Sequence, residues 1–568
     1  MRGRKTRRRR LDGSGAEADA FRVRVLPLIV LSFLLALTGA CQRPPQPTSQ
    51  QGIGGAASSA VDQGAASVAA GVVASNAPPG IGWFKGSVQE AFADARRSGR
   101  PVLLFWGAVW CPFCHTLKAT VFIRPDFIAK TRLFVPVYLD GDDAGAQAWG
   151  ERFGVLGYPT LVVLDADQHE ILRLGAGHEV SEYASVLDVA LEDLQPIDAL
   201  LPLAAAGKPL NADQCRRLAF NEWTLDSIEP QRYAAQAAAL QAASKACPAG
   251  PEGANLAIYA ASFEAQSQAS TGATRASVSP RLSALMDQVS AVLDQPQLAL
   301  ATAPALTALG ASFFKAAQSR SPALADSLRD RYVSTMDAAA ASPHFAVADQ
   351  LGFLDAKIDA LMSLTDPHQP PPADVLKSVD ARIDAALDAE KSPYVRPGLV
   401  NAALNILEDT DQYDKAYQIA KAEIARSETP YYYQADLAEI AEKLGRKDEA
   451  IQLLDVAYHG AHGPATRFQW GALYISGLLR MTPKDDQRIQ QAGLEVLGEL
   501  DGPDRIAARA RVRLAKLDQE LRHWNSKANG AHAQVLRALH ARSRQICVKV
   551  PAAQPARASC DAFLSHAA

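Results

Sequence analysis

The chain has 568 residues, of which 48% are hydrophobic and 21% are charged, and its formal net charge is −3. A chain of this length is too long to fold around a single hydrophobic core, and it suggests about two to four domains. The balanced charge, with no basic face in the sequence beyond the first 24 residues, argues against a nucleic-acid-binding protein.

The N-terminus has the pattern of an export signal. The first 24 residues carry nine Lys or Arg against three acidic residues, and residues 25–40 are uncharged and too short to span a bilayer permanently. The sequence Leu37–Cys41 (LTGAC) resembles the lipobox of bacterial lipoproteins, although Thr38 departs from the usual residue at its position. The resemblance implies a signal peptide over residues 1–40 and lipidation of Cys41. An ordinary signal peptide, cleaved without lipidation, is the alternative.

Residues 41–80 are dominated by Ala, Gly, Ser, Pro and Gln. Such a composition cannot bury a core, so we expect a disordered, flexible tether. In lipoprotein sorting of the enteric type, Gln42 in place of Asp after the lipidated cysteine implies outer-membrane placement. The expected location is therefore the bacterial cell envelope, facing the periplasm, with the inner leaflet of the outer membrane favoured over the inner membrane.

Residues 81–197 alternate helix and strand patterns. Their order, βαβ followed by ββα, predicts a three-layer α/β domain. The expected elements are an amphipathic helix at 87–97, a strand at 102–106, a helix opened by a cysteine pair, a strand at 133–139, a short helix at 144–153, a hairpin of strands at 161–164 and 170–174, and a helix at 181–194.

The cysteine pair lies in Trp110-Cys111-Pro112-Phe113-Cys114, just after the first strand. Two cysteines separated by two residues at a helix start can close a disulfide, and the helix N-terminus favours the thiolate of Cys111. This arrangement is typical of thiol–disulfide exchange, in which Cys111 attacks and Cys114 resolves the mixed disulfide. A zinc site would need a second close pair of ligands, and the sequence has no second Cys-x-x-Cys. No nicotinamide or flavin motif is visible either, so we expect no metal and no cofactor.

Three separated features resemble the thioredoxin superfamily: the Trp-Cys-x-x-Cys sequence, the Gly154–Thr160 loop (GVLGYPT), and the terminal ββα pattern. The resemblance implies that Pro159 is a cis-proline facing the cysteines and that the backbone of Tyr158 pairs with an extended substrate. It also implies that Trp110 flanks the substrate groove. A plain turn proline and a core tryptophan are the alternatives. Phe105 stands where thioredoxins have a buried acid that shuttles protons, so we expect water or an external group to do so here.

Three further expectations concern polar residues near or beyond the cysteine pair. His115 could titrate usefully near neutral pH, but a solvent-facing helical position is favoured. The acidic pairs Asp142-Asp143 and Asp485-Asp486 are expected to lie on ordinary solvated faces.

Lipidation of Cys41 would leave six cysteines, and an even number in an exported chain fits three disulfides. Sequence order suggests Cys215–Cys247 and Cys547–Cys560 as structural bridges beside the redox pair. Each would stabilise the fold by about 3–4 kcal/mol in the chain-entropy model. A redox relay through Cys215 and Cys247 is the alternative.

The remainder of the chain is rich in Ala and Leu and predicts an α-helical region over 198–545, followed by a C-terminal tail at 546–568. Similar residues recur 34 positions apart, which is the period of tetratricopeptide helix pairs. The matching positions are Asp414 and Asp448, Ala416 and Ala450, and Pro430 and Pro464. We therefore expect tetratricopeptide-like repeats at about 396–464.

Together these features predict a lipid-anchored, periplasmic thiol–disulfide oxidoreductase that reduces disulfides of exported proteins. A membrane thiol-electron carrier is the expected reductant, and no nucleic acid is expected to bind. A disulfide oxidase or isomerase would use the same residues with another direction of electron flow. The alternative from a different class is a helical-repeat protein-binding scaffold with a subsidiary thioredoxin-like module.

Overall fold

The computed structural model describes residues 77–143, 145–175, 178, 180–224, 230–270, 278–365, 369–502 and 505–565. The predicted signal peptide, Cys41 and most of the predicted tether lie outside these residues. Within the described ranges, no helix has both the length and the apolar character needed to cross a membrane.

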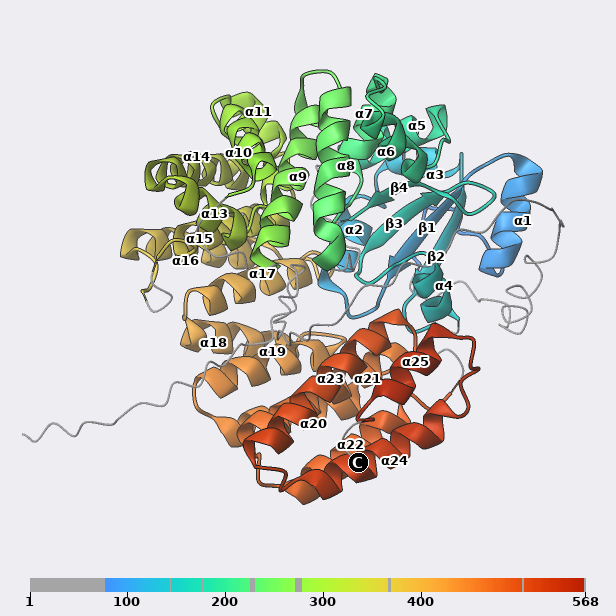
Figure 1. Ribbon diagram of the computed structural model, residues 1–568, viewed down its shortest axis with the longest axis vertical. Coiled ribbons are helices and arrows are strands. Elements are labelled where there is room, and N and C mark those ends of the chain that lie inside the picture. Colours follow the sequence, from blue (N-terminus) through green and yellow to red (C-terminus); the bar gives the residue numbers. More distant parts are fainter. Residues whose placement is uncertain are drawn as a thin grey trace, which may run out of the picture.

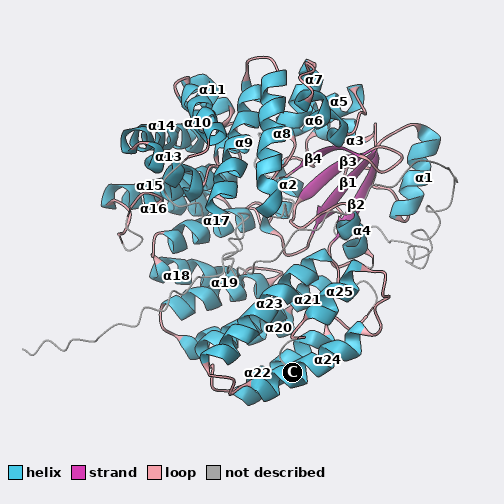
Figure 2. Ribbon diagram, viewed as in Figure 1, coloured by secondary structure: helices cyan, strands magenta, loops and turns pink. Residues whose placement is uncertain are grey.

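A four-stranded mixed sheet forms the centre of the N-terminal α/β domain and is drawn in magenta in Figure 2. The strand order is β2-β1-β3-β4, with β1 parallel to β2 and antiparallel to β3, and β3 antiparallel to β4. The strands are almost entirely buried because helices cover both faces. Their bounds are β1 (Val102–Gly107), β2 (Val135–Asp140), β3 (Thr160–Leu164) and β4 (Glu170–Leu174).

Successive side chains of β1 point to opposite faces of the sheet and so reach two separate cores. Leu103 and Phe105 pack with residues of α2, α3 and α5, whereas Leu104 and Trp106 pack with residues of α1 and α4. This three-layer arrangement confirms the predicted fold class, and the helix α3, which opens with a proline, was not predicted. The helices are α1 (Val88–Ser98), α2 (Pro112–Thr120), α3 (Pro125–Thr131), α4 (Ala146–Arg152) and α5 (Glu182–Glu192).

From residue 197 onward, the described chain contains helices and no strand. A capping box at Asn211 starts α7, and serines at positions 279 and 321 cap α10 and α14, as expected for helix N-termini. The first half of this helical region comprises α6 (Ile197–Ala205), α7 (Ala212–Phe220), the 3-10 turn η1 (Pro230–Arg232), α8 (Tyr233–Ala246), α9 (Pro251–Ser270), α10 (Pro280–Leu293), α11 (Pro296–Ala301), α12 (Ala303–Leu306), α13 (Ala311–Arg320), α14 (Pro322–Ala341), α15 (Val347–Met362) and α16 (Ala373–Ala389).

The second half of the helical region begins with helices at a regular spacing. The starts of α17, α19 and α21 are 34 residues apart, at Arg396, Pro430 and Pro464. The tetratricopeptide designation itself stays a prediction. The helices are α17 (Arg396–Asp409), α18 (Tyr413–Ile424), α19 (Pro430–Lys443), α20 (Lys447–Gly460), α21 (Pro464–Met481), α22 (Asp486–Gly498), α23 (Ala508–Lys527), α24 (Ala533–Cys547) and α25 (Pro555–Ala562).

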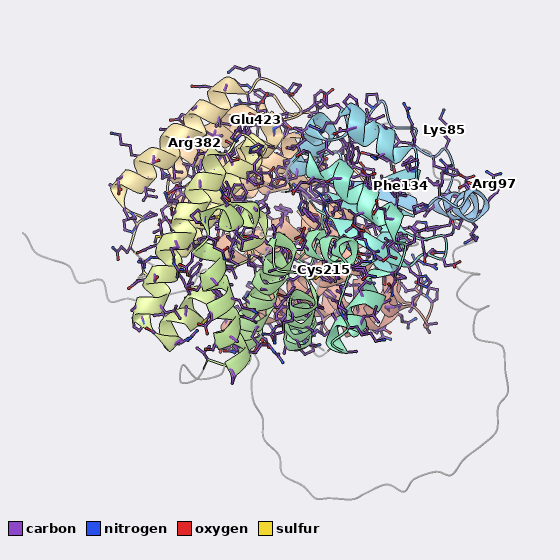
Figure 3. The ribbon with its side chains drawn as sticks, turned by 90° about the horizontal axis from the view of Figure 1, so that it is seen from above. Lys85, Arg97, Phe134, Cys215, Arg382 and Glu423 are labelled. Carbon is purple, nitrogen blue, oxygen red and sulfur yellow. A yellow bond between two sulfur atoms is a disulfide. The ribbon has the colours of Figure 1, made fainter. Side chains whose placement is uncertain are left out.

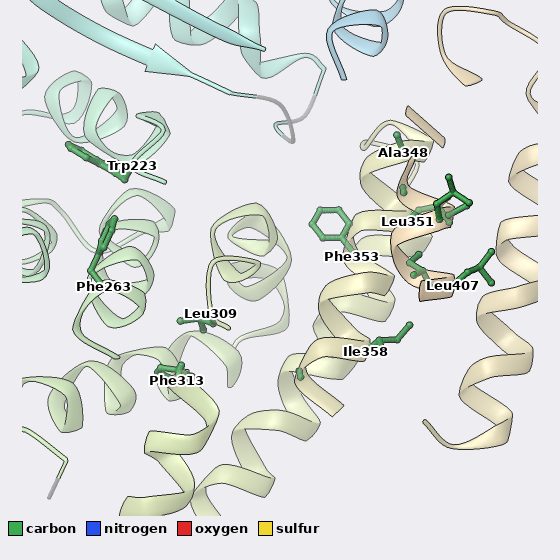
Figure 4. Packing of buried hydrophobic residues seen from close by; sticks show 14 of the residues in the cluster. Trp223, Phe263, Leu309, Phe313, Ala348, Leu351, Phe353, Ile358 and Leu407 are labelled. Atoms are coloured by element: carbon green, nitrogen blue, oxygen red, sulfur yellow. The ribbon is translucent and has the colours of Figure 1, made fainter. Parts of the chain in front are cut away.

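The sequence predicted a C-terminal tail at 546–568. In the structure, the described part of this segment is folded. It contains the end of α24 and all of α25, whose buried side chains include Ala556 and Cys560. These side chains join one apolar core that runs through the whole helical region. Figure 4 shows part of this core, where Leu351 and Ile358 of α15 lie beside Leu407 of α17.

The start of the helical region covers the free edge of β4. The amide of Arg173 donates a hydrogen bond to Asn221 Oδ1 (2.9 Å), and the carbonyl of Arg173 accepts one from the amide of Glu222 (2.9 Å). From this edge the helices curve around the α/β domain, and α23, near the chain's end, contacts α4 (Figure 1). The helical region therefore contacts the domain on two sides.

Candidate active site

The cysteine pair lies where β1 leads into α2. Cys111 is the N-cap residue of α2, Pro112 occupies the first helical position, and the Cys111 sulfur accepts a hydrogen bond from the amide of Cys114 (3.1 Å). Proline suits this position because its missing N–H would have no partner there. The two cysteines form a disulfide with their Cα atoms 5.2 Å apart. When reduced, the Cys111 sulfur would lie at the positive end of the helix dipole, which favours the thiolate.

The loop before β3 reaches the same end of the sheet. The Tyr158–Pro159 peptide bond is cis, the configuration that the resemblance implied. Trp106 pairs with Thr160, so Pro159 comes opposite the residue after Trp106, at the end of β1 that leads to the cysteines. Tyr158 packs against the apolar cluster that contains both cysteines. The structure therefore brings the cysteine pair and the cis-proline loop to one edge.

Beside the Cys114 sulfur, Gly107 makes room for the Phe105 ring. A Cβ on Gly107 would lie 3.6 Å from Cys114 Sγ and only 2.9 Å from the Phe105 ring, so the side chains here pack closely. Phe105 is fully buried and brings no proton acceptor. The neighbouring strand supplies an acid instead, because Gly107 pairs in register with Asp140 and the two residues face the same side of the sheet.

Asp140 is a buried carboxyl group that the sequence reading missed. It is 4% exposed, and burial, together with the charges of Asp142 and Asp143, raises its pKa to about 6. The Asp142 amide donates to Oδ1 (3.0 Å), while Oδ2 has no hydrogen-bond partner among the described residues. The sequence did contain a signal for this residue: Asp140 is an acidic residue at the end of a buried strand, next to the strand that leads to the cysteines.

Lys118 and Tyr138 complete a buried polar group on this face. The Lys118 ammonium group donates a hydrogen bond to the Tyr138 hydroxyl (2.7 Å). Burial lowers the pKa of Lys118 to about 8, and the charge of Asp140 opposes this shift. Lys118 lies one helical turn after Cys114, so it stands on the same side of α2. The site therefore contains groups that can exchange protons near neutral pH.

Both cysteines are buried, and the helical region packs on the residue beside them. Cys111 is 2% exposed and Cys114 is fully buried. Trp110 donates a hydrogen bond from Nε1 to Thr466 Oγ1 (2.8 Å), and its ring stacks on Tyr432 with centroids 6.1 Å apart. The edge of the ring also meets Trp470 of α21, at a centroid distance of 5.2 Å. The groove role predicted for Trp110 thus stays a prediction, while this structure places the residue in an interdomain contact.

Helix α17 packs directly on the cysteine-bearing helix. A Cβ on Gly398 would lie 2.5 Å from Thr116 Oγ1, so only glycine permits this approach without movement of Thr116. His115, expected to face solvent, is instead half-buried, with Nε2 2.7 Å from the carbonyl oxygen of Val109. Burial lowers the pKa of His115. The expectation was wrong because a segment distant in the sequence packs over this side of α2.

Polar contacts join the α/β domain to the helical region along a boundary that we call the seam. It includes Asp142 and Trp110 on the domain side, and the start of α21 and the arginines of α23 on the helical side. Asp142 Oδ1 accepts hydrogen bonds from the amides of Ala465 and Thr466 (3.0 Å each), and the Thr466 hydroxyl donates to Oδ2. Asp142 therefore caps the N-terminus of α21 instead of lying on a solvated face. Its neighbour Asp143 accepts a hydrogen bond from the Asp140 amide (3.2 Å), so it too is engaged.

Arginines of α23 extend the same seam. Arg509 donates to the carbonyl oxygen of Leu156 (2.7 Å), and its guanidinium lies 4.3 Å from the centre of the Tyr158 ring. Arg511 forms an ion pair with Glu151 at 2.7 Å. The side chain of Tyr158 is thus held by the helical region, next to the cis-proline loop.

The other four cysteines that the structure describes form two further disulfides. Cys215 bonds to Cys247, and Cys547 bonds to Cys560. Cys215 belongs to α7 within the helical region and is labelled in Figure 3. In the described ranges, no group of three or more His, Cys, Asp or Glu side chains could hold a metal ion. The first bridge joins α7 to the residue after α8, and the second joins α24 to α25.

Comparison with known families agrees with this architecture. Residues 88–190 match a family model described as a thioredoxin-like domain, and this segment contains Cys111, Cys114 and Pro159. The chain therefore consists of a thioredoxin-like α/β domain followed by a large helical region. No curated protein gives a significant match to the chain.

Proposed function

We propose that the protein is a thiol–disulfide oxidoreductase whose redox centre is the Cys111–Cys114 pair. The observation that carries the proposal is a cysteine pair at the start of α2, beside a cis-proline loop, in a thioredoxin-like domain. The direction that we favour is reduction of substrate disulfides, with oxidation or isomerisation as the alternatives.

The proposed reaction has two steps. The Cys111 thiolate attacks one sulfur of a substrate disulfide, which forms a mixed disulfide and releases the other substrate sulfur as a thiolate. Cys114 then loses its proton and attacks the Cys111 sulfur, which releases the second substrate thiolate. The substrate gains two electrons and takes up two protons, and the Cys111–Cys114 disulfide remains to be reduced again.

Asp140 is the group that we expect to receive the Cys114 proton. It faces the same side of the sheet as Gly107, where the Cys114 sulfur lies, and its pKa of about 6 allows it to be ionised at neutral pH. Lys118 tunes this carboxylate through its own charge. This arrangement supplies from β2 the proton acceptor that Phe105 cannot supply from β1.

We further propose that the protein works in the bacterial envelope, anchored through a lipid on Cys41, with exported disulfide-containing proteins as substrates. The LTGAC sequence and the composition of residues 41–80 support this location. A membrane thiol-electron carrier would return the electrons. Labelling cells with a palmitate analogue tests the anchor, because Cys41→Ser should lose the label and Cys215→Ser should retain it.

The decisive experiment for the redox function traps substrates. Cys114→Ser should accumulate mixed disulfides between Cys111 and envelope proteins, visible as reductant-sensitive high-mass bands. The matched control is the double variant Cys111→Ser/Cys114→Ser, which should give none. Absence of such bands from a folded Cys114→Ser protein would contradict the proposal.

A second candidate function is a helical scaffold for protein partners. The coverage of Cys111 by the helical region favours it, because a buried disulfide meets no substrate in this arrangement. Cys111→Ser separates the two functions. A scaffold would keep its cellular role in this variant, whereas an oxidoreductase would lose it.

A further inference from the structure

The dithiol and the helical region are in contact through a small set of side chains. Among the described hydrophobic side chains before Ile197, Trp110 is the one that packs against the helical core. Polar contacts lie beside it, such as Glu151 with Arg511 and Arg509 with Leu156, while α17 packs on α2 at Gly398. Polar interfaces within a chain are those that most readily separate.

We propose that the helical region is a releasable internal cover on Cys111, and that the cap of Asp142 on α21 holds it closed. In the closed arrangement Cys111 is out of reach of a protein disulfide; in the open one, Trp110 and Cys111 become accessible together. The proposal rests on the proposed function only for its purpose, because opening can be measured without any substrate.

We call Asp142 and its hydrogen bonds to α21 the latch. Asp142 suits this role because its carboxylate accepts several hydrogen bonds at once. Its carboxylate accepts hydrogen bonds from two backbone amides and one hydroxyl at the start of α21, a helix of 18 residues. The helix dipole adds to this attraction for a negative charge. In the same place Thr466 also accepts the hydrogen bond from Trp110, so one residue of α21 links the cap to the residue beside Cys111.

Gly463 shows how closely the latch fits. It precedes α21 with a φ of +87°, and a Cβ at this position would collide with the Asp142 carboxyl group. Gly445 offers a comparison within the helical region. It has a φ of +77°, yet a Cβ there would meet nothing within 4 Å. An alanine is strained at either glycine, and more so at 463, where ψ is 151°; of the two, only the alanine at 463 meets Asp142, and Asp142→Ala tests the latch without this strain.

The test measures access to Cys111 in the full chain. In a Cys114→Ser background, Cys111 is a free thiol while the two other disulfides stay intact. The rate of its modification by a polyethylene-glycol maleimide is followed by gel shift and located by mass spectrometry. Iodoacetamide serves as the small probe.

Asp142→Ala and Gly463→Ala should each raise the rate of maleimide labelling about 5- to 30-fold, the effect expected for a lost N-cap. The controls are Asp485→Ala, which removes a cap inside the helical region, on α22, and Gly445→Ala. Both controls should stay within about twofold of the parent, because Asp485 and Gly445 lie inside the cover and away from its contacts with Asp142 and Trp110. Iodoacetamide should discriminate less between variants, because it needs a smaller opening.

Two results would overturn the proposal. One is equal labelling of seam variants and controls when circular dichroism shows all of them folded. The other is maleimide labelling of the parent as fast as that of an unfolded thiol. If a seam variant fails to fold, hydrogen exchange of the unaltered protein decides, since the first turn of α21 and the segment around Cys111 must then open together and before the helical core. Fast labelling of the seam variants with slow labelling of the parent, but without any trapped substrate, would refute the proposed function and support the cover.

Discussion

Replacement of Asp140 by asparagine should stabilise the protein in a pH-dependent manner. The folded environment raises the pKa of this carboxyl group from 3.8 to about 6. Each pKa unit corresponds to about 1.4 kcal/mol, so the ionised carboxylate costs about 3 kcal/mol in the folded state. Asp140→Asn keeps the oxygen that accepts the Asp142 amide and removes the charge.

The sign follows from a folded pKa that lies above the unfolded one. The contribution of Asp140 to stability is fully present below about pH 3.8 and is lost as the pH rises through about 6. The variant should therefore match the parent near pH 4 and exceed it by up to about 3 kcal/mol at pH 8. Calorimetric unfolding of the oxidised protein at pH 4, 6 and 8 measures this difference.

Asp501→Asn is the matched control, because Asp501 is exposed enough to keep its charge solvated and its pKa is lowered by Lys549. It should gain nothing at pH 8. A stability difference for Asp140→Asn that is independent of pH would refute the reasoning, as would a loss at pH 8. In either case the Asp140 carboxylate would be electrostatically compensated, and its assignment as the proton acceptor of Cys114 would lose its basis.

Three further outcomes follow from local packing and burial. Gly107→Ala should lower stability by about 1–3 kcal/mol and shift the reduction potential of the pair, because its Cβ would lie 2.9 Å from the Phe105 ring; thermal unfolding and a glutathione titration measure both. Joint replacement of Cys547 and Cys560 by alanine should cost about 3 kcal/mol by loss of a disulfide, seen in urea unfolding. His178→Phe should reduce the loss of stability on acidification between pH 6.5 and 4, since burial lowers the pKa of His178 to about 4 and its charging opposes folding there; unfolding midpoints across this range test it.

The local parts of the structure could be predicted because each depends on neighbouring residues. The strand at Val102–Gly107, the N-terminal position of Cys111 and the hairpin of β3 and β4 follow from apolar runs, a proline after the first cysteine and turn residues. The segment predicted as a strand from 133 begins two residues later because α3 and its turn occupy the preceding chain. Short-range signals therefore sufficed for these elements and the cysteine pair, but not for α3.

The cover on the site could not be predicted, because its contacts join residues more than 280 positions apart. Asp142 and Ala465 lie 323 residues apart, and Trp110 and Thr466 lie 356 apart. An acidic pair after a strand looks solvated when only its neighbours are considered. Asp142 is engaged because a helix N-terminus from a distant repeat-like segment arrives beside it.

The cover has a consequence for the redox chemistry that links the two halves of the chain. If closure favours the disulfide over the dithiol, part of the closure free energy enters the reduction potential of Cys111–Cys114. About 1.4 kcal/mol of such preference lowers a two-electron potential by about 30 mV. Seam variants that open the cover should then be less stable in the disulfide form and have a higher potential than the parent. A potential identical in the parent and in Asp142→Ala would mean that closure controls only access to Cys111 and leaves the energetics of its disulfide unchanged.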